Sequence, residues 1–188
     1  MQNVCVFCGA SPGEKPIFMQ SAKALGEAIS HASMGLVYGG AKVGLMGQVA
    51  NAVLAGGQKV VGVIPQSFAH KVSHEGLTEL HVVDSMHTRK AMMFELAGAC
   101  IALPGGFGTL EELTEVLTWA QLGFHQKPIG LLNINGYYDA LLSFFDQAVL
   151  AGFLKPKHLE LLIVHHDPTK LLQLLEDYKP KTVAKWSN

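Results

Sequence analysis

Short apolar runs and longer amphipathic segments alternate along the whole chain. Each short run is largely apolar and is bounded by glycine, proline or asparagine, which is typical of buried strands. The predicted strands cover residues 3–7, 35–38, 59–65, 79–83, 100–104, 128–133 and 161–164. Between them, apolar positions at helical spacing predict helices over residues 16–33, 45–55, 86–97, 109–122, 137–151 and 168–178. Thr109 and Asp167-Pro168 are start signals for two of these helices.

This alternation predicts an α/β fold. We expect a Rossmann-like three-layer arrangement, in which a mainly parallel sheet of about seven strands carries helices on both faces. No repeat or linker divides the sequence, so residues 1–188 are expected to form a single domain with a loosely attached tail after residue 178. Ligands of such sheets bind at the carboxyl ends of the strands. The turns after Phe7, Tyr38, Val83 and Pro104 are therefore the places to look for a site.

Composition narrows the classes of function. The formal net charge is −1, which argues against a protein that collects nucleic-acid phosphates on a basic face. No apolar run reaches the roughly 20 residues that a membrane span needs, and the first residues do not resemble a leader. We expect a soluble cytoplasmic protein. The 49% of hydrophobic residues fits either a subunit interface or a sheet covered on both faces.

Two motifs near the N-terminus suggest chemistry that the residues do not support. GASPG, at residues 9–13, has the spacing of a serine nucleophile elbow, but Pro12 lacks the N–H that the oxyanion hole of that elbow requires. A turn in which the Ser11 hydroxyl touches a ligand is the favoured interpretation. Cys5 and Cys8 form a single C-x-x-C whose side chains would point to opposite faces of a strand. They are interpreted as buried structural thiols, and the odd total of three cysteines fits a reducing compartment.

The histidines and the second glycine-rich turn carry no recognisable site of their own. None of the nine histidines has the spacing of a zinc motif, so no metal site is predicted. The turn over residues 38–47 is rich in glycine and opens a helix, but it matches neither the dinucleotide-binding nor the P-loop pattern. A dehydrogenase is therefore not favoured, and this turn indicates either close backbone packing or the approach of a ligand.

The stretch LPGGFGTLEEL, at residues 103–113, places three glycines and a threonine between a strand and a helix. Such a turn brings backbone N–H groups and the positive end of the helix dipole to an anion. Thr109 and Glu112 also have the spacing of a capping box, and a carboxylate such as Glu111 is favoured in a first helical turn. These structural explanations leave the cluster of Gly105, Gly106 and Gly108 unexplained, which favours an anion site.

A second unusual stretch is DSMHTRKAMMFELA, at residues 84–97. Asp84 or Ser85 can cap this helix, which places Arg89 and Lys90 close to its positive end, where cations are unfavourable. A solvated basic face is the structural alternative. The arrangement is easier to understand if an anion or a carboxylate from elsewhere completes it. Because both helix starts can face the same edge of the sheet, Arg89 and Glu112 can meet over one pocket.

The two stretches together resemble the paired signature of a known family. MHTRK at residues 86–90, followed by PGGFGTLEE at residues 104–112, is similar to the Lonely Guy family, the cytokinin riboside 5'-monophosphate phosphoribohydrolases. The resemblance covers nearly the whole chain and includes VCVFCGASPG, LVYGGAKVGLMG, GVIP and TWAQLGFHQKPIGLLN. An older label for such sequences, lysine decarboxylase, is not supported, because nothing in the sequence indicates a pyridoxal phosphate site.

The resemblance implies a nucleotide-binding domain that hydrolyses the N-glycosidic bond of N6-substituted adenosine 5'-monophosphates, giving a free base and ribose 5-phosphate. Arg89 and Glu112 match the family's catalytic residues, and the glycine turn with its helix would hold the 5'-phosphate. The expected substrate-binding residues are Ser11, Gly39, Gly40, Met86, Lys90, Gly105, Gly106, Phe107, Gly108, Thr109, Leu110, Glu111 and Thr118.

The resemblance also implies a homodimer with its active site near the subunit interface, and no metal or organic cofactor. Neither nucleic acid nor a membrane is expected as a partner. Ala41 and Lys71 depart from residues common in the family, so N6-isopentenyl-AMP, AMP and other nucleotides stay open as substrates. A non-catalytic nucleotide or cofactor carrier of the same fold is the alternative. Such a carrier could keep the glycine turn but would not need the pair of Arg89 and Glu112.

Overall fold

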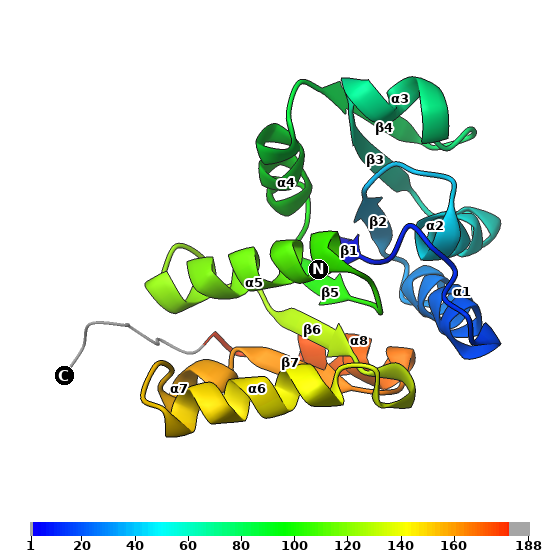
Figure 1. Cartoon of the computed structure of the whole chain (residues 1–188). Coiled ribbons are helices and arrows are strands. Elements are labelled where there is room, and N and C mark those ends of the chain that lie inside the picture. The colour runs from blue at the N-terminus through cyan, green and yellow to red at the C-terminus, as the bar shows by residue number, and fades with distance from the viewer. Residues whose placement is uncertain (1, 181–188) are drawn as a thin grey trace.

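The computed structural model describes residues 2–180, and its centre is a seven-stranded sheet (Figure 1). The strands are β1 (Asn3–Phe7), β2 (Gly35–Tyr38), β3 (Val60–Pro65), β4 (Glu79–Val83), β5 (Ala99–Ala102), β6 (Ile129–Leu132) and β7 (Leu162–His165). Their order is β4-β3-β2-β1-β5-β6-β7, and every neighbouring pair is parallel. Each predicted strand is confirmed, and the sheet is parallel throughout.

Helices connect the strands in the predicted alternation. They are α1 (Pro16–His31), α2 (Gly44–Ala55), α3 (Gln66–Val72), α4 (Met86–Glu95), α5 (Phe107–Leu122), α6 (Asp139–Leu150), α7 (Pro156–Leu159) and α8 (Pro168–Glu176), with a 3-10 turn, η1 (Ile134–Gly136). The six predicted helices are present. The sequence pattern missed α3 because none of its residues is buried, so it has no apolar stripe. It missed α7 and η1 because they are too short to show a period.

The helix starts confirm two predicted caps and correct a third. Ser85 caps α4 by accepting a hydrogen bond from the Thr88 N–H at 3.1 Å, and Asp167 caps α8 in the same way. Thr109 was expected to start α5, and a capping box with Glu112 was the structural alternative, but the helix begins two residues earlier, at Phe107. Its cap is Gly106, which has no side chain to offer, and Thr109 is the third residue of the helix.

Two apolar layers cover the sheet. On one face, α1, α2 and α8 pack over strand residues such as Val4 and Val6. On the other face, α4, α5 and α6 pack over Cys5 and Phe7. The three-layer arrangement with helices on both faces is thus confirmed (Figure 1). The three cysteines are free and buried, and Cys8 belongs to the layer opposite Cys5, as the strand alternation predicted.

Most of the predicted tail, residues 181–188, lies outside the described residues. Within residues 2–180, no helix combines the length and the apolar character that crossing a bilayer requires. Nor do histidine, cysteine, aspartate or glutamate side chains gather in threes at a place that could hold a metal ion, as far as the structure describes the chain.

Candidate active site

The strand order reverses between β1 and β5, because the chain adds strands outward from β1 in one direction and then in the other. Parallel sheets open a crevice at the carboxyl ends of the strands at such a point. A cleft of about 560 Å³ lies there. Its walls come from the turns after β1, β5 and β6 and from the first turns of α1, α2, α4 and α5. Of the four strand ends predicted from the sequence, β1 and β5 contribute their turns, while β2 and β4 contribute the helices that follow them.

Backbone contacts join three of these turns. The Gly9 N–H donates to the carbonyl of Pro104 at 3.0 Å, which ties the β1 turn to the β5 turn. The Leu45 N–H donates to the carbonyl of Gly9 at 3.1 Å, which adds the start of α2. Gly44 has a φ of 57° and lies so close to the Ala10 backbone that a Cβ would overlap it. The second glycine-rich turn therefore serves close backbone packing at the cleft wall.

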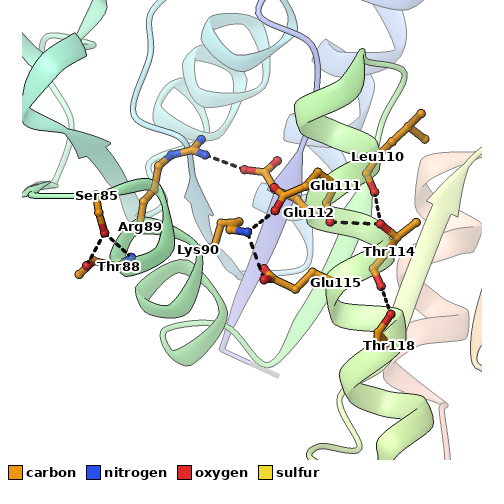
Figure 2. Close-up of polar contacts among 10 residues, drawn as sticks. All are labelled: Ser85, Thr88, Arg89, Lys90, Leu110, Glu111, Glu112, Thr114, Glu115 and Thr118. Carbon is orange, nitrogen blue, oxygen red and sulfur yellow. Dashed lines mark hydrogen bonds and ion pairs between the residues drawn. The ribbon is translucent and has the colours of Figure 1, made fainter.

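Arg89 and Glu112 form an ion pair across the cleft wall (Figure 2). Arg89 comes from α4 and Glu112 from α5, and the distance from Arg89 Nη1 to Glu112 Oε1 is 2.6 Å. The Nε of Arg89 also donates to the carbonyl of Val63 at 3.1 Å, so the guanidinium is held from the end of β3 as well. Both residues are buried, with exposed fractions of 9% and 6%. Gly39 makes room for this pair, because a Cβ there would overlap the guanidinium.

The ionisation of Glu112 depends on opposing influences. Burial raises the pKa of Glu112 above its ordinary value, while the charge and the hydrogen bond of Arg89 oppose this rise. A buried carboxylate that lines a cleft and has a shifted pKa is a candidate for proton transfer. Burial also raises the pKa of the Cys8 thiol, which lines the same cleft. This thiol is therefore neutral and unsuited to act as a nucleophile.

Lys90 points away from the cleft, although it is adjacent to Arg89. Its Nζ donates to the carboxylates of Glu111 and Glu115, and the distance to Glu115 is 3.1 Å (Figure 2). The Lys90 side chain is 7% exposed, and neither Lys90 nor Glu111 lines the cleft. The two cations of α4 thus bind carboxylates on two different faces of α5, and the solvated basic face considered from the sequence is not present.

The glycines at the start of α5 occupy their positions for two different reasons. Gly105 has no space for a side chain, because a Cβ would overlap Thr109 and lie 2.9 Å from the backbone nitrogen of Gly9. Gly106 and Gly108 face open space, and neither has a positive φ. Packing within the chain therefore does not require glycine at these two positions. Their small size leaves the backbone at the mouth of the cleft open to a ligand.

The start of α5 offers hydrogen-bond donors at this open position. The first hydrogen bond inside the helix runs from the Leu110 N–H to the carbonyl of Gly106 at 3.1 Å. The N–H groups of Phe107, Gly108 and Thr109 precede it, so helix geometry provides them with no carbonyl. Together with the helix dipole, they form a place for an anion. The cleft thus combines an anion site at one end with a buried carboxylate and guanidinium beside it.

Comparison with known proteins identifies the family of this chain. Residues 46–175 match a family model described as "Possible lysine decarboxylase". The probable cytokinin riboside 5'-monophosphate phosphoribohydrolase LOGL2 of Oryza sativa subsp. japonica is 49% identical, over 98% of this chain and 77% of its own. The cytokinin riboside 5'-monophosphate phosphoribohydrolase LOG7 of Arabidopsis thaliana is 48% identical, over 96% of this chain and 83% of its own. The chain belongs to the family of cytokinin riboside 5'-monophosphate phosphoribohydrolases.

Solved structures of more distant proteins share the fold. The molybdenum cofactor binding protein from the phototrophic bacterium Rippkaea orientalis matches with a TM-score of 0.71 and 23% identity, over 93% of this chain and 95% of that chain. At this level of identity, the likeness concerns the α/β architecture alone.

The residues expected from the resemblance to the phosphoribohydrolase family fall into two groups. The cleft is lined by Ser11, Met86, Arg89, Gly105, Gly106, Gly108, Thr109 and Glu112. The other expected residues, Gly39, Gly40, Lys90, Phe107, Leu110, Glu111 and Thr118, do not line it within one chain. Among these, Thr118 borders a separate cavity of about 140 Å³, and Phe107 is 94% exposed.

Several residues that line the cleft were not predicted from the sequence. Phe18, Leu45, Met46 and Tyr137 add apolar and aromatic surface to it. The hydroxyl of Tyr137 also donates to the carbonyl of Gly105 at 2.7 Å, which supports the glycine turn from the β6 side. Tyr137 could have been found by applying the rule of carboxyl strand ends to β6. Phe18 lies within a helix, and no sequence signal separates it from core residues.

Proposed function

We propose that this protein hydrolyses the N-glycosidic bond of N6-substituted adenosine 5'-monophosphates, releasing the free cytokinin-type base and ribose 5-phosphate. The observation that carries the proposal is the buried pair of Arg89 and Glu112, which meets the cleft beside the open start of α5. Membership of the phosphoribohydrolase family supports the same reaction. The matching family model is described as a possible lysine decarboxylase, but the cleft does not support that activity. Enzymes that use pyridoxal phosphate hold this cofactor through a lysine, and no lysine lines the cleft formed by residues 2–180.

The substrate phosphate binds at the start of α5 in this proposal. The N–H groups of Phe107, Gly108 and Thr109 and the hydroxyl of Thr109 hold its oxygens. The sugar then extends along the cleft toward Glu112, and Ser11 and Met86 contact the nucleotide. Gly39, Gly40, Leu110 and Glu111 shape the site without lining it. A metal or organic cofactor has no part in this reaction scheme.

Glu112 and Arg89 carry the chemistry in this scheme. As the bond between C1' and the base nitrogen breaks, its electron pair leaves with the base and positive charge builds on the ribose. The carboxylate of Glu112 stabilises this charge and takes a proton from the water whose oxygen bonds to C1'. The departing base takes a proton from solvent, and Glu112 then returns the proton it accepted to solvent, so the net reaction consumes one water molecule. Arg89 keeps Glu112 ionised and oriented through a charge-assisted hydrogen bond.

The proposal is tested by release of free base from a panel of purified nucleotides. The panel contains N6-isopentenyl-AMP, AMP, GMP and N6-isopentenyladenosine, which lacks the phosphate. We expect release from N6-isopentenyl-AMP with ribose 5-phosphate as the second product, and little release from the nucleoside, because the anion site is then empty. Absence of release from every nucleotide, with nucleotide binding intact, would instead favour the carrier, an alternative that the shared fold keeps open.

Replacement of Gly108 by alanine is expected to have different effects on the stability of the fold and on phosphate binding. A Cβ at this helical position meets nothing within 4 Å. We expect Gly108→Ala to be neutral or to raise the free energy of unfolding by about 0.5 to 1 kcal/mol, because alanine is the better helix former. The same methyl group obstructs a phosphate at the start of α5, so KM should rise about tenfold or more. Urea unfolding and steady-state kinetics test the two effects, and an unchanged KM would place the phosphate elsewhere.

We also propose that the protein is a cytoplasmic homodimer. Within residues 2–180, five large apolar side chains are more than 60% exposed on the isolated chain: Phe107, Phe124, Phe144, Leu150 and Phe153. Three of them, Phe124, Leu150 and Phe153, are at or within a few residues of the carboxyl ends of α5 and α6. These two helix ends lie at the same end of the molecule (Figure 1). Sedimentation velocity should give twice the 20.2 kDa mass of the chain. A species of 20.2 kDa at micromolar concentration would contradict the dimer.

A further inference from the structure

Lys90 occupies a buried position between α4 and α5, on the side of Glu112 that faces away from the cleft. Its ammonium group binds Glu111 and Glu115, whose side chains are 53% and 25% exposed, while its own side chain is 7% exposed. Lys90, Glu112 and Glu115 also border one narrow gap together with Phe7 from β1. Glu112 therefore has a cation on each side, with Arg89 toward the cleft and Lys90 behind it.

The spacing of Glu111, Glu112 and Glu115 along α5 means that the contacts of Lys90 affect the orientation of this helix. Glu111 and Glu115 are one turn apart on α5 and lie on the same face, where two like charges repel each other. Lys90 bridges them, while Glu112 turns toward Arg89 (Figure 2). Two adjacent residues of α4 thus hold two faces of α5, which fixes the rotation of α5 about its own axis. The direction in which Glu112 points depends on that rotation.

We propose that Lys90 is a positioning residue for the phosphoribohydrolase reaction: through Glu111 and Glu115 it fixes α5 and places a second positive charge beside Glu112, without contacting the substrate. This inference rests on the proposed function, and it assigns Lys90 a role different from the substrate contact that the family resemblance implied.

The charged groups around Glu112 predict effects of opposite sign. Burial raises its pKa, Arg89 and Lys90 lower it, and Glu111 raises it. The Cys5 thiol on β1 and the Cys8 thiol just after it are both within reach of the Glu112 charge, but burial raises the pKa of each thiol, so both are neutral. Loss of Lys90 should therefore raise the pKa of Glu112, and loss of the Glu111 charge should lower it. General loosening of the fold would not produce opposite shifts.

Titration of the Glu112 carboxyl by NMR measures these shifts directly. The protein is labelled with ¹³C at the glutamate carboxyl carbons, and the Glu112 signal is the one that Glu112→Gln removes. We expect the titration midpoint of Glu112 to be higher in Lys90→Met than in wild type by about half a pH unit or more. In Lys90→Arg the midpoint should stay close to the wild-type value, and in Glu111→Gln it should be lower. The acid limb of kcat/KM should move in the same directions, whereas KM should change less than about threefold.

A binding measurement separates positioning from substrate contact. Ribose 5-phosphate is titrated into wild type and Lys90→Met by calorimetry, and we expect dissociation constants within about twofold of each other. A loss of tenfold or more would make Lys90 a substrate contact, and shifts of the same sign in Lys90→Met and Glu111→Gln would also overturn the proposal. If Lys90→Met does not fold, Glu111→Gln decides alone, since an unchanged or raised midpoint contradicts the inference.

These tests remain informative if the proposed function fails. The NMR midpoints require no turnover, so they report on the role of Lys90 even if wild type releases no base from any nucleotide. Release of base by wild type together with unshifted midpoints would leave the phosphoribohydrolase in place and remove the positioning role of Lys90.

Discussion

Replacement of Glu112 by glutamine is expected to abolish base release while leaving nucleotide binding intact. Glutamine keeps the size of the side chain. It also keeps an oxygen that can accept the hydrogen bond from Arg89, which is 2.6 Å long in wild type. It lacks the negative charge that would stabilise the ribose in the transition state, and it cannot take a proton from water. General base catalysis contributes about 10²- to 10⁴-fold, and electrostatic stabilisation by one group about 10²- to 10³-fold. We therefore expect kcat to fall by about 10³-fold or more.

The matched control is Glu95→Gln, which makes the same chemical change at the end of α4, outside the cleft. It should keep most of the activity, because Glu95 is exposed to solvent. Base release is measured by chromatography, and AMP binding by calorimetry at the same pH. Near-normal turnover by Glu112→Gln would remove Glu112 from the mechanism. Inactivity of wild type as well, with AMP still bound, would favour the carrier.

The sequence was sufficient to predict the fold and the meeting of Arg89 and Glu112 over one pocket. Strand and helix patterns depend on burial, and the five inner strands β1, β2, β3, β5 and β6 are almost entirely buried, so their apolar runs were unambiguous. The edge strands β4 and β7 are only partly buried. Ser85 and Asp167 were recognisable as caps because their side chains act locally. The convergence of Arg89 and Glu112 followed from the parallel topology, which brings consecutive helix starts to one edge of the sheet.

The details that sequence reasoning missed depend on rotation and on small differences in helix register. Arg89 and Lys90 are adjacent in the chain, but one residue of an α-helix is about 100° of rotation, so one cation faces the cleft and the other does not. Thr109 had the spacing of a capping residue, yet α5 begins at Phe107, with Gly106 at the cap position. Motif spacing alone contains neither piece of information.

Replacement of Arg89 by methionine is expected to cost both stability and activity, with a characteristic pH dependence. Methionine fills similar space but leaves the buried carboxylate of Glu112 without its partner. Breaking a buried ion pair in this way typically costs about 3 to 5 kcal/mol. Because Arg89 opposes the effect of burial, its loss should raise the pKa of Glu112 further above the ordinary glutamate value. At neutral pH, a smaller fraction of Glu112 is then ionised, and kcat/KM should fall by about 10²-fold or more.

The sign of the pH effect on stability follows from that raised pKa. A carboxyl whose pKa is higher in the folded than in the unfolded protein binds protons more tightly when folded, so acid favours the folded state. Arg89→Met should therefore approach wild type in free energy of unfolding near pH 4, and lose this stability as the pH rises through the folded pKa of Glu112. Urea unfolding at pH 4.5 and pH 8 measures the difference, and a deficit that is equal at both would contradict the argument.

The double variant Arg89→Met/Glu112→Gln tests whether the deficit comes from the unpaired charge. Glutamine removes the charge that methionine leaves behind, so the double variant should be more stable at pH 8 than Arg89→Met alone, and its stability should depend less on pH. Arg89→Lys completes the set. Lysine keeps the positive charge, so the pKa of Glu112 should change little. It lacks the planar guanidinium that donates to the Val63 carbonyl and to Glu112 at the same time, so kcat should still fall. A lysine variant with full activity would reduce the role of Arg89 to its charge.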